Sequence, residues 1–115
     1  MINLHIHTNK SLDGVFDINE VLNMCEKNEI SYVSITDHDT CDAYKEIKNN
    51  NFTGKIVTGI EADALIGKET YDILCYGFEL ENVSKWAKDR FTTIEERQTK
   101  ILVKIQEENT LKQNY

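Results

Sequence analysis

The sequence has no proline, one tryptophan, five glycines and only three histidines among its 115 residues. It has no internal repeat and no low-complexity linker beyond the run 49–51, which favours a single domain. No apolar run approaches the roughly 20 residues that cross a bilayer. No basic stretch followed by an apolar one marks a signal peptide. We therefore expect no membrane association and a cytoplasmic location.

Cysteine is scarce as well, and its placement excludes two kinds of site. The three residues are Cys25, Cys41 and Cys75, an odd number at wide spacing with no C-x-x-C pair. A disulfide framework or a cysteine-based zinc site is therefore not expected, and the pattern fits a reducing compartment. Cys75 is expected to be a packed core thiol.

Acidic residues exceed basic ones, and the excess is uneven along the chain. Residues 1–80 hold 6 Lys and Arg against 14 Asp and Glu, a balance of −8, whereas residues 81–115 hold 7 against 6, a balance of +1. The net charge of −7 therefore arises in the part that holds the histidines. Clustered carboxylates favour either a solvated acidic surface or a cation site. The lack of a basic patch argues against autonomous nucleic-acid binding.

Residue patterns in the first half predict alternating strands and helices. Residues 2–7 alternate apolar and polar side chains, which is typical of a strand. Asp17 followed by Glu20 predicts a helix start, and apolar residues at i, i+3, i+4 and i+7 continue the helix. β-Prone residues predict further strands over 32–35 and 55–60.

The rest of the chain completes the expected fold. A helix is predicted over 42–48 with Thr40 as its N-cap, and residues 63–76 predict two strands around the turn 67–68. Apolar residues at steps of three and four predict a long helix over 83–112. The order β-α-β-α-β, followed by a hairpin and a long helix, predicts an α/β fold with a parallel sheet.

Metal-binding types of side chain follow the three expected parallel strands. Because the carboxyl ends of parallel strands meet at one edge of a sheet, we expect these side chains to lie close together. Neutral imidazoles with carboxylates suit Zn²⁺, Mn²⁺ or Fe²⁺, and a bridging carboxylate such as Glu61 could hold two ions. The candidates are His5, His7, Asp13, Asp37, His38, Asp39 and Glu61.

Four short motifs, in this order and at these spacings, resemble the PHP (polymerase and histidinol phosphatase) family over residues 2–78. They are His5-Ile6-His7-Thr8, Ser11-Leu12-Asp13-Gly14, Thr36-Asp37-His38-Asp39-Thr40 and Gly59-Ile60-Glu61. The resemblance implies a distorted TIM-like barrel, usually seven-stranded, with up to three divalent metals in its C-terminal mouth. Members hydrolyse phosphoesters through metal-activated water. Others accompany bacterial DNA polymerases as proofreaders or inactive modules.

Carried over by motif, the resemblance implies a set of metal ligands. His5, His7 and Glu61 would bind one metal, Glu61 would bridge to a second, and Asp13 and His38 would hold a third. Mn, Fe or Zn would fill two or three such sites, with Mg as a further candidate. The substrate would be a phosphorylated small molecule or a nucleotide.

Three polar residues near the motifs are expected to support neighbouring groups rather than to bind metal. Asn3 stands where the family often has an aspartate, and it brings an acceptor without a charge. Asp37 and Asp39 flank His38. Asp37 is expected to orient a neighbour, and Asp39 could instead start the next helix.

Two further residues have open alternatives. Asp72 stands where the family commonly has a histidine. It is either a further ligand that favours Mn²⁺ or Mg²⁺ or a solvated or paired acid. Arg97 lies in the stretch 94–102, which resembles the arginine-bearing helix of the family. It is either a phosphate contact or a solvated helix residue.

The family's remaining ligands, typically a histidine and then an Asp-x-His, lie downstream, and this sequence has no histidine after His38. The resemblance implies that residues 1–115 are a PHP-type metal-binding domain forming roughly the first half of a (β/α)7 barrel. We expect weak or absent hydrolysis by this chain. Alternatives are a non-catalytic interaction or structural module and a polymerase-associated segment. The apolar stripe of 83–112 could also pair with a second copy, which would give a homo-oligomer.

Overall fold

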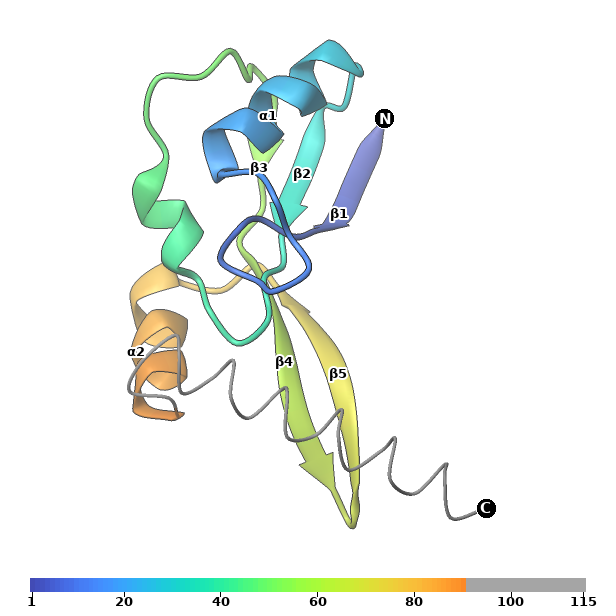
Figure 1. Cartoon of the computed structure of the whole chain (residues 1–115), viewed down its shortest axis with the longest axis vertical. Coiled ribbons are helices and arrows are strands. Elements are labelled where there is room, and N and C mark those ends of the chain that lie inside the picture. Colours follow the sequence, from blue (N-terminus) through green and yellow to red (C-terminus); the bar gives the residue numbers. More distant parts are fainter. Residues whose placement is uncertain (91–115) are drawn as a thin grey trace.

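The computed structural model of this chain describes residues 1–90. In chain order its elements are β1 (Ile2–Ile6), α1 (Ile18–Lys27), β2 (Tyr32–Ile35), the 3-10 helix η1 (Asp42–Glu46), β3 (Lys55–Ile56), β4 (Gly59–Ile66), β5 (Glu69–Tyr76) and α2 (Leu80–Arg90). β1, β2 and β3 form a parallel sheet in that order, and β4 and β5 form an antiparallel hairpin that extends away from it (Figure 1). The architecture is α/β with a parallel sheet, as predicted.

Helix α1 connects β1 to β2 and supplies one wall of the core. The Asp17 carboxylate caps it by accepting the Glu20 N–H at 2.9 Å. Its buried side chains recur at the predicted spacing and are Ile18, Val21, Leu22 and Cys25. They join Val33 and Ile35 of β2 in one apolar cluster. Burying a large apolar side chain contributes roughly 1.5–3 kcal/mol, so this packing fixes the sheet that carries the polar residues.

The prediction of a single third strand over 55–60 is wrong, because the chain leaves the sheet after two residues. β3 pairs with β2 only over Lys55–Ile56, and β4 begins at Gly59 and pairs with β5. The buried Tyr44 hydroxyl occupies the junction. It donates to the Ile35 carbonyl at 2.6 Å and accepts the N–H groups of Ile35 and Gly59 at 3.1 and 2.9 Å. Glu61 consequently lies inside β4 rather than after a strand.

The start of β4 lies directly against the end of β2. A Cβ at Gly59 would lie 2.1 Å from Ser34 Oγ and 2.8 Å from Thr36 Cγ2, so only glycine fits there without a shift of its neighbours. Two residues further on, His38 and Glu61 form an isolated parallel bridge. The hairpin is thereby joined to the parallel sheet at its carboxyl end.

Two further predictions need correction in the segment after β2. The expected helix over 42–48 is a 3-10 helix, η1, confined to Asp42–Glu46. Its N-cap is Cys41, which makes no side-chain capping bond, whereas the Thr40 hydroxyl accepts the Asp42 N–H at 3.1 Å from one residue earlier. A 3-10 turn is short because its hydrogen bonds have poorer geometry than those of an α-helix.

The cysteines differ from one another in their surroundings. Cys25 and Cys41 are buried, and burial, together with the nearby charges of Asp42 and Asp37, raises the pKa of the Cys41 thiol to about 12. Cys75 is exposed on β5, so the prediction of a packed core thiol is wrong. β5 pairs with β4 along its whole length, yet all eight of its residues are exposed.

The hairpin over 63–76 agrees with the predicted pair of strands. Its turn places Gly67 at φ 65°, in the region that favours glycine. At its base, the Tyr76 hydroxyl donates to the Leu4 carbonyl of β1 at 2.5 Å. Helix α2 covers Leu80–Arg90, and the remainder of the predicted helix 83–112 lies outside the described residues. Within residues 1–90, no helix has the length and apolarity needed to cross a membrane.

Candidate metal centre

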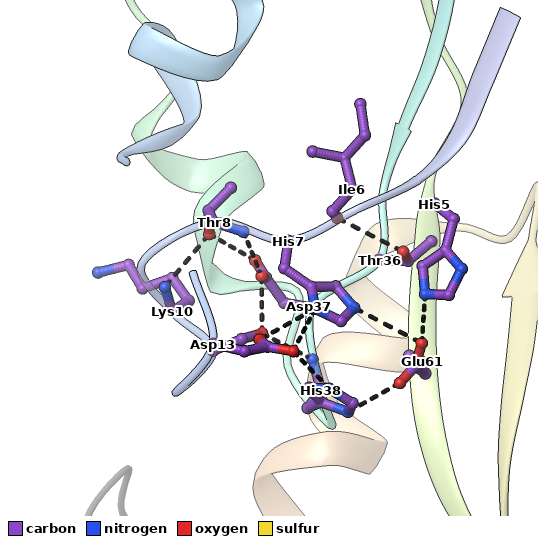
Figure 2. Close-up of polar contacts among 11 residues, drawn as sticks. His5, Ile6, His7, Thr8, Lys10, Asp13, Thr36, Asp37, His38 and Glu61 are labelled. Carbon is purple, nitrogen blue, oxygen red and sulfur yellow. Dashed lines mark hydrogen bonds and ion pairs between the residues drawn. The ribbon is translucent and has the colours of Figure 1, made fainter. Parts of the chain in front are cut away.

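Three segments converge at the carboxyl end of the sheet (Figure 2). The first is the end of β1 with the loop that follows it, the second is the turn after β2, and the third is the start of β4. Main-chain bonds align the last two: the Glu61 N–H donates to the Asp37 carbonyl and the Asp39 N–H donates to the Glu61 carbonyl, both at 3.0 Å. These bonds fix the Glu61 side chain opposite His38.

The Glu61 carboxylate contacts all three histidines. Its Oε1 lies 2.5 Å from His5 Nε2 and 3.5 Å from His7 Nε2, and its Oε2 lies 3.0 Å from His38 Nδ1. The Glu61 side chain is only 7% exposed, whereas His5 is 54% exposed. A buried acid with imidazoles on both of its oxygens is suited to serve two neighbouring sites at once.

Asp13, on the loop after β1, faces two of the same histidines. Its Oδ2 lies 2.9 Å from His7 Nδ1 and 3.5 Å from His38 Nε2. The rings of His7 and His38 have centroids 4.5 Å apart. Partial burial tends to raise the pKa of Asp13, but the hydrogen bond from His7 and the charges of His7 and His38 together hold this pKa below its ordinary value.

Ligand-type atoms meet in three overlapping groups, with the atoms of each group within 4.8 Å of one another. The groups are His5, His7 and Glu61; His7, Asp13 and His38; and His38, Glu61 and Asp72. Asp72 comes from β5, where it pairs with Asp63 and lies two residues before Leu74, the partner of Glu61. Asp72 is thus near the other candidates, which leaves its role as a ligand open.

The surroundings of His7 fit a cation. Its Nε2 is buried, and within residues 1–90 it has no hydrogen-bond partner. When Nδ1 carries the proton and donates it to Asp13, Nε2 holds a lone pair that faces the Glu61 carboxylate at 3.5 Å. Two acceptors that face each other are unfavourable unless a cation lies between them. Two atoms bound to one metal ion at about 2.1 Å each lie roughly 3 to 4 Å apart, which fits this pair.

Asn3 and Asp39 lie outside these groups and hydrogen-bond to backbone N–H groups instead. Asn3 Oδ1 accepts the backbone N–H of His5 at 3.2 Å. Asp39 adopts a positive φ of 54°, and its Oδ1 accepts the Asp63 N–H at 2.9 Å, so it holds β4 to the turn after β2. Arg97 lies outside the described residues.

Sequence reasoning missed three supporting residues, Thr8, Ser11 and Tyr44. Thr8 and Ser11 are buried and donate hydrogen bonds to Asp37, and Tyr44 secures the start of β4. Nothing in the local pattern marks Tyr44. Thr8 and Ser11 lie within the motifs quoted above. Their hydroxyl groups, close in sequence to the candidate ligands His7 and Asp13, are the feature that could have identified them.

A comparison with solved structures finds an amidohydrolase from Chromobacterium violaceum, solved with bound sulfate and no metal, at a TM-score of 0.63 and 21% sequence identity. The match covers 76% of this chain and 32% of that chain, so this chain spans about a third of that protein's length. The likeness shows the fold. A comparison with curated proteins finds no match. The family model described as PHP domain matches residues 3–114, and the chain therefore belongs to the PHP domain family.

Proposed function

We propose that this chain is a metal-dependent hydrolase of phosphate esters, acting on a phosphorylated small molecule or a nucleotide. The observation that carries the proposal is the convergence of three imidazoles and two carboxylates from three segments of the chain. They are His5, His7, Asp13, His38 and Glu61. Membership of the PHP domain family supports hydrolase-type chemistry that depends on divalent metals.

In this proposal the residues have different roles in binding two or three cations. Divalent cations there supply positive charge to the phosphoryl oxygens and acidify a water nucleophile. Glu61 presents Oε1 to His5 and His7 and Oε2 to His38, so one carboxylate joins two groups. Asp13 accepts the Nδ1–H of His7 and thereby leaves Nε2 free for coordination.

The mixed ligand set also bears on metal identity. Imidazoles with carboxylates suit Mn²⁺, Fe²⁺ or Zn²⁺. The group formed by His38, Glu61 and Asp72 has two carboxylates, which supports Mn²⁺ or Mg²⁺ at that position. We therefore include Asp72 as a further proposed ligand.

We further propose that residues 1–115 form one PHP-type domain that corresponds to the first part of a distorted TIM-like barrel. The parallel strands β1–β3, with the candidate ligands beyond their carboxyl ends, support this arrangement. The sequence has no histidine after His38, so we expect slow turnover by this chain alone.

The test is a metal titration of the purified 115-residue chain after chelator treatment. Isothermal titration calorimetry with Mn²⁺ and with Zn²⁺ should detect binding, and His7→Ala should weaken it strongly. Hydrolysis of p-nitrophenyl phosphate and of a nucleoside monophosphate should be slow and should disappear on chelation. Absence of binding for both ions would refute the proposal.

The matched control is Glu29→Gln. Glu29 is exposed and lies between α1 and β2, at the amino end of the sheet and opposite the candidate centre. The substitution Glu29→Gln removes one negative charge. Any general electrostatic effect on cation affinity therefore appears in this variant too. Metal affinity in Glu29→Gln should match that of the unaltered chain.

A non-catalytic metal-binding module is the second candidate function. It is favoured by the histidine content of the given sequence, whose three histidines all lie within residues 1–38. This candidate predicts that Mn²⁺ raises the melting temperature while no phosphoester in the panel is hydrolysed. Measurable hydrolysis that is lost in His7→Ala would decide against it.

A further inference from the structure

Asp37 lies beside the candidate centre, and its side chain is turned toward the loop after β1 (Figure 2). The residue is 1% exposed. Its Oδ1 accepts the Thr8 N–H at 2.7 Å and the Ser11 hydroxyl at 2.8 Å, and its Oδ2 accepts the Thr8 hydroxyl at 2.6 Å. We call Thr8, Ser11 and Asp37 the Asp37 clamp.

The clamp connects two of the three segments that form the candidate centre. Ser11 Oγ, while donating to Asp37, accepts the backbone N–H of His38 at 2.9 Å. The loop that carries Ser11 also carries Asp13, two residues later. The loop and the backbone of His38 are therefore joined through one hydroxyl, which holds the segment that carries Asp13 close to the segment that carries His38.

The main chain of Asp37 connects the third segment. Its carbonyl accepts the Glu61 N–H at 3.0 Å. Asp37 thus contacts the Asp13 loop through its side chain, the Glu61 segment through its carbonyl, and His38 as its chain neighbour.

The charge of Asp37 adds to this positional role. All three donors to its carboxylate are uncharged groups, and within residues 1–90 no lysine, arginine or histidine forms an ion pair with it. Burial of a carboxylate is unfavourable even when it is well hydrogen-bonded. A cation bound by the neighbouring histidines would be attracted by this charge at short range, where the screening by water is weak.

We propose that Asp37 is a positioning residue for metal binding: it orders the 8–14 loop so that Asp13 meets His7 and His38, and it places a negative charge beside the cation. The inference rests on the proposed function for its second part, because only a metal-binding chain has a cation to attract. Its first part, the ordering of the loop, holds for the metal-free chain.

The primary test is Asp37→Asn in the full chain, with two measurements. Asparagine keeps one oxygen for the Thr8 N–H and the Ser11 hydroxyl and removes the charge. Amide hydrogen exchange of Thr8 and His38 in the metal-free protein reports the loop, and calorimetric titration with Mn²⁺ reports affinity. We expect affinity to fall about 10- to 100-fold, the range typical of groups that support metal ligands, with Glu29→Gln unchanged.

A second pair of variants covers the case in which Asp37→Asn does not fold. Thr8→Ser keeps the hydroxyl that donates to Asp37, whereas Thr8→Val keeps the shape and removes the donor. We expect Thr8→Ser to bind Mn²⁺ as the unaltered chain does and Thr8→Val to bind it at least several-fold more weakly. A purely structural role would change the melting temperature of Thr8→Val and leave its affinity, measured well below melting, the same.

The outcomes separate the inference from the proposed function. Equal Mn²⁺ affinity in folded Asp37→Asn and the unaltered chain, or in Thr8→Ser and Thr8→Val, overturns the inference while leaving metal binding intact. If the unaltered chain binds no metal, the proposed function fails, and the metal-binding part of the inference fails with it. In that event, faster exchange of the His38 amide in Asp37→Asn still supports the ordering of the loop, and unchanged exchange overturns that part as well.

Discussion

Strand β4 passes through two different environments within eight residues. Its first four residues, 59–62, are buried, whereas Leu65 and Ile66 at its other end are exposed. At the buried end, Glu61 is held by main-chain bonds to the turn after β2. At the exposed end, Leu65 and Ile66 are held by pairing with Thr70 and Glu69 of β5. The order of the candidate centre therefore comes from contacts between distant segments, while the order of the hairpin comes from neighbours in sequence.

The largest effect in this comparison is expected at Glu61. Glu61→Gln should lower Mn²⁺ affinity by more than about 100-fold, because one carboxylate serves all three histidines. Glu69→Gln on β5 removes the same charge from the exposed hairpin and should leave affinity unchanged. Calorimetric titration measures both variants. Similar losses in the two would show that general charge, not the buried position, controls binding.

The junction between β3 and β4 gives the next largest effect. Tyr44→Phe removes the hydroxyl from backbone groups of Ile35, Val57 and Gly59 and leaves them without this partner, which should lower the free energy of unfolding by about 2 to 3 kcal/mol. Tyr71→Phe serves as the comparison in the hairpin, since its hydroxyl bonds only to the exposed Glu69. Urea unfolding should show less than about 0.5 kcal/mol for Tyr71→Phe.

Two glycines of the hairpin test the same difference by steric means. Gly59→Ala places a Cβ 2.1 Å from Ser34 Oγ and should cost about 2 kcal/mol, through overpacking at the buried end. Gly67→Ala meets no atom within 4 Å, but its φ of 65° costs about 1 kcal/mol. Chemical denaturation measures both values. A larger loss for Gly67→Ala would mean that the turn, rather than the junction, limits the stability of the hairpin.

The smallest effect concerns pH. Burial raises the pKa of Cys41 from 9.0 to about 12 in the folded chain, so the unfolded thiol ionises first as the pH rises. The contribution of this thiol to stability is complete below pH 9 and decreases between pH 9 and pH 12. Cys41→Ala should lose less stability than the unaltered chain between pH 8 and pH 10. Equal losses of stability in Cys41→Ala and the unaltered chain would contradict a raised pKa of Cys41 in the folded chain.

Elements that depend on neighbouring residues could be predicted from the sequence. Asp17 and Glu20 mark the start of α1, and the alternating residues on either side of Gly67 mark the hairpin. The α/β class with a parallel sheet followed from their order. In these cases the signal lies within a few residues, because helix caps and hairpin turns are local structures.

The remaining features depend on contacts across long stretches of sequence. The end of β3 is set by Tyr44, whose hydroxyl reaches Gly59 15 residues away, and Asp37 takes its partners from 26 and 29 residues earlier. Neither pairing leaves a periodic pattern. The candidate ligands were predicted from their positions after the expected strands and from motif resemblance. The structure brings six of them together, counting Asp72, while their roles in metal binding stay predictions.

The bond between the Tyr76 hydroxyl and the Leu4 carbonyl joins residues 72 positions apart. During synthesis, β1 leaves the ribosome well before β5 does, since chains emerge from the N-terminus at roughly 5–20 residues per second. The Leu4 carbonyl of β1 therefore gains the Tyr76 hydroxyl as a partner only after the hairpin has been synthesised. His5 and His7 are translated among the first residues, yet their common partner Glu61 arrives with β4, so the centre cannot assemble before β4 has been made.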